Sequence, residues 1–484
     1  MLTRNKIAIA SVEIVLKQLI AILTIIALAR ILQPSDYGEI TPIYILIAIS
    51  TGLIDFGIGS AIVRFKELGH EGESTAFWIN ISVAIFIVIV MLITSSFAAL
   101  YFDNEKLQIY IYIISISIAF SSIGSIQQYI LLRDKKFHKL LQVGLLSSIS
   151  ASIISVFMAY KGYGPYALIM QIVIANMVSA AAVWAVSDWR PLFLVDFIAV
   201  RKLLHFGLFL TLTGIVNALY KSIASSLILK SSGVRQAGLF YNADRIQQYL
   251  SDFIVSLSSR LAFTSFVGDL DLSEKNKLFV ASLKLLCFIT CPIFFGLYSV
   301  SENIVQLTLG THWLEIVPIL KTLCVVGLFW PLEVHNQNMI KANGNLKKYF
   351  LLELLKRTFG IACIILIVPN GMQSVALCIS ILAVVFYIAN AYYSGLIIDL
   401  NVKSQLYAVL PSFISGITMS LAIQLINFDN LSLQLNVLIV KIVIGVFAYI
   451  TSSYLFNKNV LIWVFINIKN QSKYGDKSIN TWAG

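Results

Sequence analysis

Apolar runs long enough to cross a membrane follow one another along nearly the whole chain, separated by short polar loops. A helix needs roughly 20 apolar residues to span the hydrocarbon core of a bilayer. The runs are continuous rather than alternating, which favours helices over a barrel. We therefore predict an all-α integral membrane protein with about 14 transmembrane helices. They are centred near residues 20, 48, 89, 118, 150, 175, 215, 248, 288, 326, 358, 384, 415 and 445, and polar residues interrupt those near 248 and 326.

The basic residues of the chain alternate between successive loops. Only 12% of the 484 residues are charged, 58% are hydrophobic, and the net charge is +11. A basic chain can indicate a nucleic-acid partner, but alternate loops place about 21 Lys and Arg residues on one side and about five on the other, as the positive-inside rule explains. This division places both termini in the cytoplasm and gives no reason to expect nucleic acid.

A weak internal repeat relates the first half of the chain to the second at an offset near 200 residues. The pattern Lys17, Arg30, Gly38 returns as Asn217, Lys230, Gly238. A half of six spans begins and ends on the same side, so the two halves have the same orientation. This arrangement predicts a pseudo-two-fold axis along the membrane normal, with a substrate path between the halves.

The repeat also predicts the domain boundaries. We expect one six-helix bundle over residues 1–200 and a second over residues 201–400. Residues 401–456 would form two additional transmembrane helices. Residues 457–484 would form a cytoplasmic tail, in which a short apolar stretch can lie as an interfacial helix.

No motif of a membrane enzyme accompanies the predicted spans. The sequence has no GxxxxGKS/T, HExxH or GxSxG pattern. The five His residues are scattered, and the five Cys residues occur singly within spans, which is typical of core positions rather than of a metal or redox site. A polysaccharide polymerase would need a large outside loop, and none is present. We therefore predict a protein that is not an enzyme and has no cofactor.

Ionisable residues inside the spans are the candidates for function, because each costs about 2.5–3.5 kcal/mol at the bilayer centre on insertion scales. Glu13 and Lys17 are four residues apart on the first span and share a face. Lys17 lies about 15 Å into that span, near the midplane. Asp244 and Arg245 lie at similar depth in the eighth span, and Lys221 lies nearer the outer face of the seventh.

Two further acids and several polar residues extend this set. Asp55 and Asp252 lie toward the cytoplasmic thirds of the second and eighth spans. The pattern predicts a water-filled cavity lined by spans 1, 2, 7 and 8 with excess positive charge, which suits a phosphorylated headgroup. The polar neighbours are Gln18, Asn217, Tyr220, Asn242, Gln247 and Gln248.

Structural roles stay open for these residues. Glu13 and Lys17 can form a neutralised pair that only packs the first span. Arg245 can pair with acids on adjacent turns, and Lys221 can extend its ammonium group toward the interface. Asp55 can form local hydrogen bonds at the end of the second span.

Seven short motifs occur in a fixed order in the first half of the chain. They are Leu28–Gly38, Leu53–Ala61, Ser74–Asn80, Leu132–Phe137, Gly162–Leu168, Trp189–Pro191 and Gly238–Arg245. Their order resembles the Wzx-type flippases and the colanic and teichuronic acid exporters of the multidrug/oligosaccharidyl-lipid/polysaccharide superfamily. The likeness covers about residues 15–265 and is only topological beyond.

The resemblance implies two six-helix bundles with two peripheral helices, working by alternating access. It implies an undecaprenyl-diphosphate-linked oligosaccharide (an O-antigen, capsule or exopolysaccharide unit) moved from the cytoplasmic to the outer leaflet of a bacterial inner membrane. Related flippases use basic residues on spans 1 and 8, a role that passes here to Lys17 and Arg245. Many members have an Asn/Asp pair in span 7 where this chain has Lys221, so an ion-coupling role of that helix is not carried over.

These considerations assign an expected role to each candidate residue. The expected substrate-binding residues are Lys17, Arg245, Lys221, Gln18 and Asn217. The acids expected to couple transport to H⁺, Na⁺ or membrane potential are Glu13, Asp55 and Asp244. Expected partners are the lipid-linked oligosaccharide, membrane lipids, a polysaccharide polymerase and a chain-length regulator. The alternative is an ion-coupled multidrug or cation exporter of the same superfamily, which would need an acidic cavity.

Overall fold

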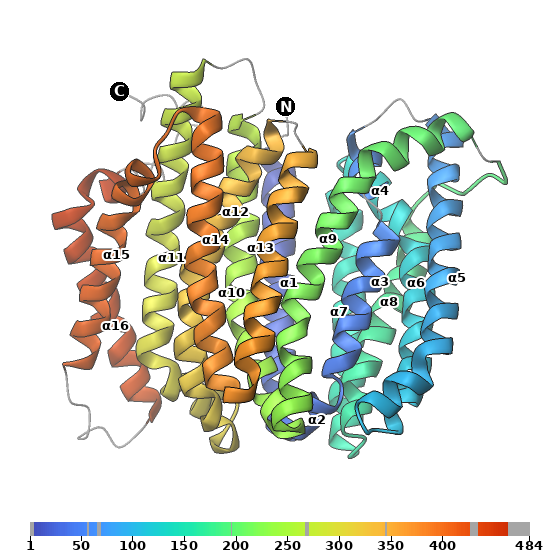
Figure 1. Ribbon diagram of the computed structural model, residues 1–484, viewed down its shortest axis with the longest axis horizontal. Helices are drawn as coiled ribbons and strands as arrows, with labels where there is room; N and C mark the ends of the chain where they lie inside the picture. Colours follow the sequence, from blue (N-terminus) through green and yellow to red (C-terminus); the bar gives the residue numbers. More distant parts are fainter. Residues whose placement is uncertain are drawn as a thin grey trace. The chain divides into compact units, whose positions relative to one another are not determined.

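The computed structural model describes residues 4–55, 58–64, 69–194, 196–266, 271–343, 346–425 and 434–462, and helices make up nearly all of them. None of these described residues lies in a β-strand. Figure 1 labels the helices along the chain. They are α1 (Arg4–Ile31), α2 (Pro34–Glu39), α3 (Thr41–Asp55), α4 (Ile58–Arg64), α5 (Gly69–Tyr101), α6 (Lys106–Arg133), α7 (Phe137–Tyr160), α8 (Pro165–Val186), α9 (Phe197–Ser232), α10 (Val234–Phe266), α11 (Leu272–Thr308), α12 (Val317–Ala342), α13 (Leu346–Ile367), α14 (Met372–Ile398), α15 (Val402–Gln424) and α16 (Gln434–Phe456), with 3-10 turns η2 (Thr311–Ile316) and η3 (Val368–Asn370).

Every predicted span centre falls within one of these helices. By length and composition, 10 helices of the described chain could cross a membrane. The second predicted span is divided between α3 and α4, so neither piece reaches that length. Polar residues lower the mean hydropathy of α10, and the charged residues Glu353, Lys356 and Arg357 lie within α13. The prediction of an all-helical, multi-pass membrane protein is confirmed.

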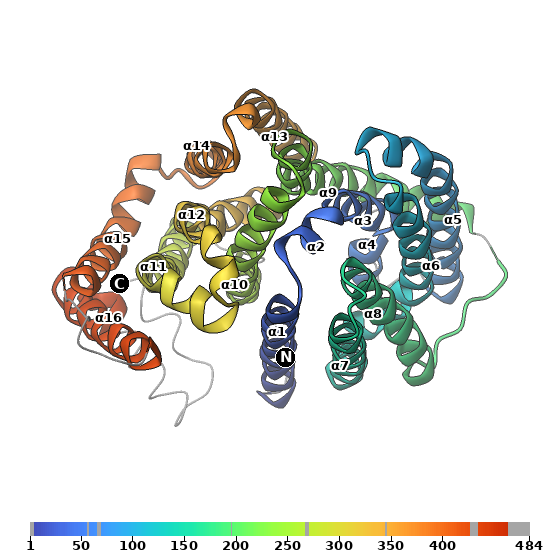
Figure 2. The same ribbon diagram turned by 90° about the horizontal axis from the view of Figure 1, so that it is seen from below.

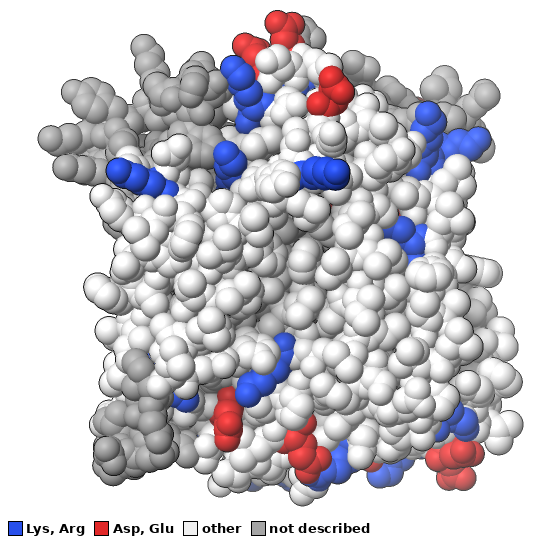
Figure 3. Space-filling view, turned by 60° about the vertical axis from the view of Figure 1, so that its left-hand side comes forward, with Lys and Arg blue, Asp and Glu red and all other residues white. Residues whose placement is uncertain are grey.

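The surface of the helices is apolar where that of a water-soluble protein would be polar. On α5, the side chains of Phe86, Ile93 and Phe97 are 66%, 73% and 70% exposed, whereas Asn80 is buried. In Figure 3, most of the visible charged residues lie near the two ends of the helices, and the band between them is mainly uncharged. A bilayer accommodates such a band, because its hydrocarbon core favours apolar contacts and excludes charge.

Contacts divide the chain into two compact units. Unit 1 comprises Met1–Tyr241 and Phe350–Gly371, and unit 2 comprises Asn242–Tyr349 and Met372–Gly484. Within unit 1, α7 packs against α1 and α8, α6 packs against α5 and α8, and α3 packs against α9. Within unit 2, α11 packs against α12 and α15, while α14 lies on α12 and α16 on α15. Figure 2 shows the α7–α8 and α15–α16 neighbours from below. The predicted domain boundaries at residues 200, 400 and 456 were derived from the sequence repeat. The division into contact units does not test them, so they stay predictions.

Two glycines that the repeat makes equivalent meet in a backbone contact within unit 1. A Cβ built on Gly38 would lie 1.8 Å from the carbonyl oxygen of Val234, and one built on Gly238 would lie 1.7 Å from that of Pro34. Adding 200 to the residue numbers turns one half of the contact into the other, so the contact has a local two-fold symmetry. We term this pair of approaches the glycine contact, and only glycine leaves room for it.

Residues of several short motifs lie at the two ends of unit 1. At the end near α2, Tyr110 donates a hydrogen bond to Glu39 at 3.1 Å and its ring packs edge-on against Tyr166. At the other end, Trp78 Nε1 donates to the carbonyl oxygen of Leu192 at 2.8 Å, and the Leu192 N–H donates to Ser74 at 3.0 Å. These bonds fix the helix ends, so the motifs explain the scaffold more than the site.

Candidate functional site

Lys17 reaches from α1 across α7 through space left by a glycine. A Cβ built on Gly144 would lie 1.8 Å from Lys17 Cε and 2.1 Å from Lys17 Nζ. The two helices pack along each other, and a 2.6 Å hydrogen bond joins the hydroxyl groups of Thr24 and Ser152. Lys17 is half-buried, so the chain places a primary ammonium group inside unit 1.

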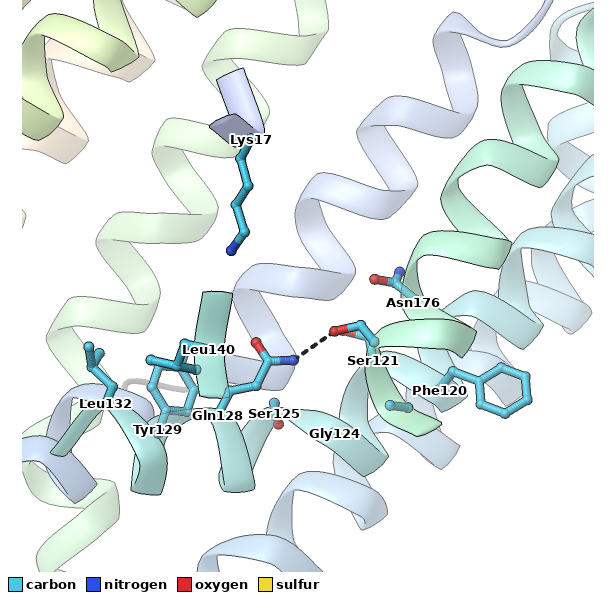
Figure 4. Close-up of a pocket in the computed structure, with 12 residues that line it drawn as sticks. Lys17, Phe120, Ser121, Gly124, Ser125, Gln128, Tyr129, Leu132, Leu140 and Asn176 are labelled. Atoms are coloured by element: carbon cyan, nitrogen blue, oxygen red, sulfur yellow. Dashed lines mark hydrogen bonds between the residues drawn. The ribbon is translucent and has the colours of Figure 1, made fainter. Parts of the chain in front are cut away.

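The ammonium group of Lys17 borders a cavity within unit 1, which we term the Lys17 cavity. Its volume is about 420 Å³. Figure 4 shows Lys17 pointing from α1 toward polar side chains on α6 and α8. The lining residues are Lys17, Phe120, Ser121, Gly124, Ser125, Gln128, Tyr129, Leu132, Leu140, Asn176, Ser179 and Ala180.

Hydroxyl and amide groups dominate the polar lining of the Lys17 cavity. Among the described lining residues none is acidic, and Lys17 supplies the charge. Gln128 Nε2 donates to Ser179 Oγ at 3.0 Å, and Asn176 Nδ2 donates to Ser117 Oγ at 2.7 Å. Both bonds tie α6 to α8, so the amides are held in place with hydrogen-bonding capacity to offer a ligand.

Of the other predicted residues of spans 1 and 2, only Gln18 has a described side chain, and it does not line this cavity. Gln18 is half-buried on α1 but is not part of the lining. Neighbouring residues of a helix point about 100° apart, which separates Gln18 from Lys17. The side chains of Glu13 and Asp55 lie outside the described residues. The coupling roles of these two acids stay predictions.

A second group of charges lies between α9 and α13 in unit 1. Arg357, only 1% exposed, donates from Nε to Asn217 Oδ1 at 2.8 Å, and its guanidinium lies 4.8 Å from the ring centroid of Tyr220. Glu353 faces Lys356 Nζ at 2.5 Å and Arg357 Nε at 3.4 Å. We term these five residues the Arg357 cluster. As described, the cluster brings two cations and one carboxylate together in a buried setting.

The Arg357 cluster defines the surroundings of the predicted residues on α9. Asn217, expected to face substrate, accepts the hydrogen bond of Arg357 with its amide oxygen. Lys221 lies one turn further along α9 and is half-buried. The substrate-binding roles of Asn217 and Lys221 stay predictions, and Arg357 is a further candidate beside them.

The sequence contains signals for the residues of the Lys17 cavity and of the Arg357 cluster. Glu353 and Arg357 interrupt a predicted span four residues apart, which places them on one helix face. Ser121 and Ser125 repeat that spacing on α6. The predicted lining by spans 2, 7 and 8 is not the lining of the Lys17 cavity, which α6, α7 and α8 complete. A search for polar residues at helical spacing within spans would have found both groups.

In unit 2, Asp244 and Arg245 each contact a residue one turn further along α10. Arg245 Nη2 donates to the hydroxyl oxygen of Tyr249 at 3.0 Å, and the guanidinium lies 5.4 Å from the centroid of that ring. Asp244 Oδ2 accepts a hydrogen bond from Gln248 Nε2 at 2.6 Å. All four side chains are half-buried. These contacts restrict the rotamers of both charged groups.

A buried carboxyl group joins α12 to α14 in unit 2. Glu333 is 1% exposed, and its Oε1 accepts N–H groups from Gln337 at 3.2 Å and Asn390 at 3.4 Å. On the next turn Ser394 donates to Asn336. Among the described residues no group of three or more His, Cys, Asp and Glu lies close enough together to hold a metal ion. The polar residues that interrupt the span near 326 thus form a hydrogen-bonded connection between helices.

Comparison with known proteins finds relatives in polysaccharide biosynthesis. Residues 27–318 match the family model described as polysaccharide biosynthesis protein. Teichuronic acid biosynthesis protein TuaB of Bacillus subtilis (strain 168) is 23% identical over 366 residues, covering 75% of this chain and 76% of TuaB. Lipopolysaccharide biosynthesis protein WzxC of Escherichia coli (strain K12) is 28% identical over 313 residues, 62% of each chain.

A solved structure shares the fold over nearly the whole chain. Lipid II flippase MurJ, in an inward closed conformation, matches with a TM-score of 0.76 and 16% sequence identity, covering 93% of this chain and 99% of that chain. At this level of identity the match shows the fold.

Proposed function

The chain belongs to the polysaccharide biosynthesis protein family, and from that premise we propose that it moves an undecaprenyl-diphosphate-linked oligosaccharide between leaflets of a bacterial inner membrane. Transport runs from the cytoplasmic to the outer leaflet by alternating access, with both termini in the cytoplasm. The names of TuaB and WzxC, which refer to teichuronic acid and lipopolysaccharide biosynthesis, support a saccharide cargo. The name and fold of the lipid II flippase MurJ support a lipid carrier.

The observation that carries this proposal is the position of Lys17. Its ammonium group borders a cavity of about 420 Å³ whose other polar groups are neutral hydroxyls and amides. A diphosphate cannot enter hydrocarbon without a partner, because desolvating an unpaired charge is prohibitively unfavourable. A charge-assisted hydrogen bond from an ammonium group offsets that loss. Lys17 therefore provides an anion-binding point inside the membrane-spanning part of the protein.

Further cations would hold the same anionic cargo at other stages of the cycle. Arg245 is the candidate in unit 2, where Tyr249 restricts its guanidinium. Lys221, Lys356 and Arg357 are the further candidates in unit 1. Gln18 and Asn217 would support these cations with neutral hydrogen bonds.

Energy for transport would come from an ion or from the membrane potential. Glu13, Asp55 or Asp244 would bind and release H⁺ or Na⁺ as the transporter changes state. One elementary charge moved across 100 mV supplies about 2.3 kcal/mol, enough to bias a two-state carrier. A polymerase and a chain-length regulator would take up the product on the outer side.

The rival proposal is an ion-coupled exporter of drugs or organic cations with the same fold. Such a substrate needs carboxylates in its binding cavity, as opposite charges attract at close range. Among the described residues that line the Lys17 cavity none is acidic. The charge of the cavity therefore favours an anionic cargo over a cationic one.

Leaflet distribution of lipid-linked oligosaccharide in a deletion strain tests the proposal. The intermediates are extracted from spheroplasts before and after treatment with an agent that modifies only outward-facing glycans. Accumulation on the cytoplasmic leaflet, reversed by the wild-type gene, supports transport by this protein. A normal distribution with normal surface glycan overturns the proposal, and increased drug susceptibility of the same strain would then support the rival.

A further inference from the structure

The Lys17 cavity has one wall whose chemistry is unlike that of a phosphate site. Five neutral polar side chains from α6 and α8 form this wall. We term these residues the polar wall: Ser121, Ser125, Gln128, Asn176 and Ser179. We propose that the polar wall is a saccharide subsite, which binds an uncharged sugar bearing hydroxyl and amide groups beside the anionic group held by Lys17. This inference rests on the proposed function and names the part of the cargo that unit 1 recognises.

The polar wall offers both donors and acceptors of hydrogen bonds. A serine hydroxyl donates one hydrogen bond and accepts others, and a carboxamide provides two N–H donors and a carbonyl acceptor. Sugar hydroxyls need such paired donors and acceptors, whereas a phosphate accepts only. The carbonyl oxygens of Gln128 and Asn176 would repel a phosphate and attract a hydroxyl group. The neutral polar wall therefore favours the sugar of a ligand, and the cationic Lys17 favours its phosphate.

Hydrogen bonds between helices hold the polar wall in place. The bonds from Gln128 to Ser179 and from Asn176 to Ser117 each cross from α6 to α8 or back. Asn80 on α5 donates to Ser125 as well. Side chains fixed before the ligand arrives lose little conformational entropy on binding. Such preorganisation is expected of a specific site and is not needed for a lipid-facing surface.

Small residues at the base of the wall let α6 and α8 pack closely beneath the cavity. A Cβ built on Gly124 would lie 3.1 Å from the Cα of Ala180, so α6 and α8 approach closely there. The volume of about 420 Å³ falls within the range of about 300–1,000 Å³ that small-molecule sites occupy. It is large enough for a monosaccharide and its attached phosphate, and too small for a whole oligosaccharide.

An aromatic ring completes the lining. Tyr129 borders the cavity one residue after Gln128. Gly59 on α4 leaves space for this ring, because a Cβ there would lie 2.1 Å from Tyr129 Cζ. The apolar face of a sugar ring packs well against an aromatic side chain that also has a polar tip. The subsite thus combines directed hydrogen bonds with one apolar platform.

Binding of two soluble probes to the purified full-length protein in lipid nanodiscs tests the subsite. The probes are N-acetylglucosamine 1-phosphate and inorganic phosphate, and their affinities are measured by saturation-transfer NMR and competition. We expect the sugar phosphate to bind the wild type about fivefold more tightly than phosphate, as one or two net hydrogen bonds would give. Gln128→Leu and Ser121→Ala should reduce this ratio toward one without changing phosphate binding. Lys17→Gln should weaken both probes.

Matched controls and separate outcomes keep the test decisive. Gln142, exposed on α7, provides the control Gln142→Leu, which should behave as wild type. Equal affinities of both probes for the wild type, or an unchanged ratio in the wall variants, overturn the subsite. Loss of phosphate binding in the wall variants overturns it too. If the deletion strain traps intermediates while the wall variants keep the wild-type ratio, only the subsite fails. If leaflet distribution is normal while the ratio changes as expected, only the transport proposal fails.

Discussion

The end of the Lys17 side chain occupies the space that a side chain on Gly144 would need. Cε and Nζ of Lys17 lie 1.8 and 2.1 Å from the position of a Cβ on Gly144. The lysine can rotate away because its end is flexible, so an added methyl group would redirect the ammonium without breaking the packing of α1 on α7. A substitution at Gly144 can therefore move the ammonium group of Lys17 while the lysine itself is kept.

Gly144→Ala should reduce transport while the protein folds normally. Alanine favours a helix over glycine by about 1 kcal/mol, so stability should not fall, but the ammonium should leave the Lys17 cavity. We expect a loss of surface polysaccharide close to that of Lys17→Gln, measured by complementation of a deletion strain at equal protein level. Gly214→Ala is the matched control, because nothing lies within 4 Å of a Cβ at Gly214. Full activity of Gly144→Ala beside an inactive Lys17→Gln would contradict the geometry.

Arg245→Gln should strongly reduce export without loss of protein. A hydrogen bond to a charged group contributes about 1.5–3 kcal/mol, which corresponds to a decrease in transport of roughly tenfold to a hundredfold. Export is measured as surface glycan, with membrane protein level determined by immunoblot. Arg235→Gln, at an exposed position near the start of α10, is the control and should retain export. Complementation by Arg245→Gln would remove Arg245 from the site.

Glu353→Gln should destabilise the protein, because it leaves Lys356 and Arg357 buried without their carboxylate. Removing one partner of a buried ion pair costs about 3–5 kcal/mol. We expect a lower melting temperature in detergent and less protein in the membrane. Adding Lys356→Met removes one of the uncompensated cations and should restore part of the lost stability. The matched control is Glu302→Gln at an exposed position, and equal melting temperatures of Glu353→Gln and this control would show that the pair contributes little.

Gly38→Ala and Gly238→Ala should each lower the melting temperature, and the double variant should be little worse than either. Both substitutions force the same two backbones apart, so their effects overlap instead of adding. Overpacking of this kind costs about 1–3 kcal/mol or more. Gly52→Ala is the control, because a Cβ there would make an ordinary 3.5 Å contact with Ile215. Additive losses would show that the two glycines act independently.

The sequence predicted the helices well because a bilayer imposes one length and one composition on each span. Every predicted centre lies in a helix, including the polar α10. The repeat was also visible, since Gly38 and Gly238 share the backbone requirement of the glycine contact. The helices depend on local composition, and the glycine contact depends on a residue type that no other replaces, so both can be read from the sequence.

The lining of the Lys17 cavity was predicted less completely, because a charged residue within a span is costly and stands out, whereas a neutral polar residue does not. Lys17 was singled out by its depth in the first span. Ser121, Gln128 and Asn176 are less conspicuous in the sequence, because a single serine or amide in a span has a low cost and many satisfy a local hydrogen bond. Which helix faces which could not be read from periodicity, so the lining of the cavity needed the structure.

The charges of α13 have a consequence for how the protein enters the membrane. Glu353, Lys356 and Arg357 would together oppose insertion of an isolated helix by roughly 8 kcal/mol, while each leucine or phenylalanine returns only about 0.3–0.6 kcal/mol. The α9 helix, which provides Asn217 and Tyr220, leaves the ribosome first. The later helix therefore depends on the earlier one to become a stable membrane segment, and a defect in α9 should appear as a failure of α13 to insert.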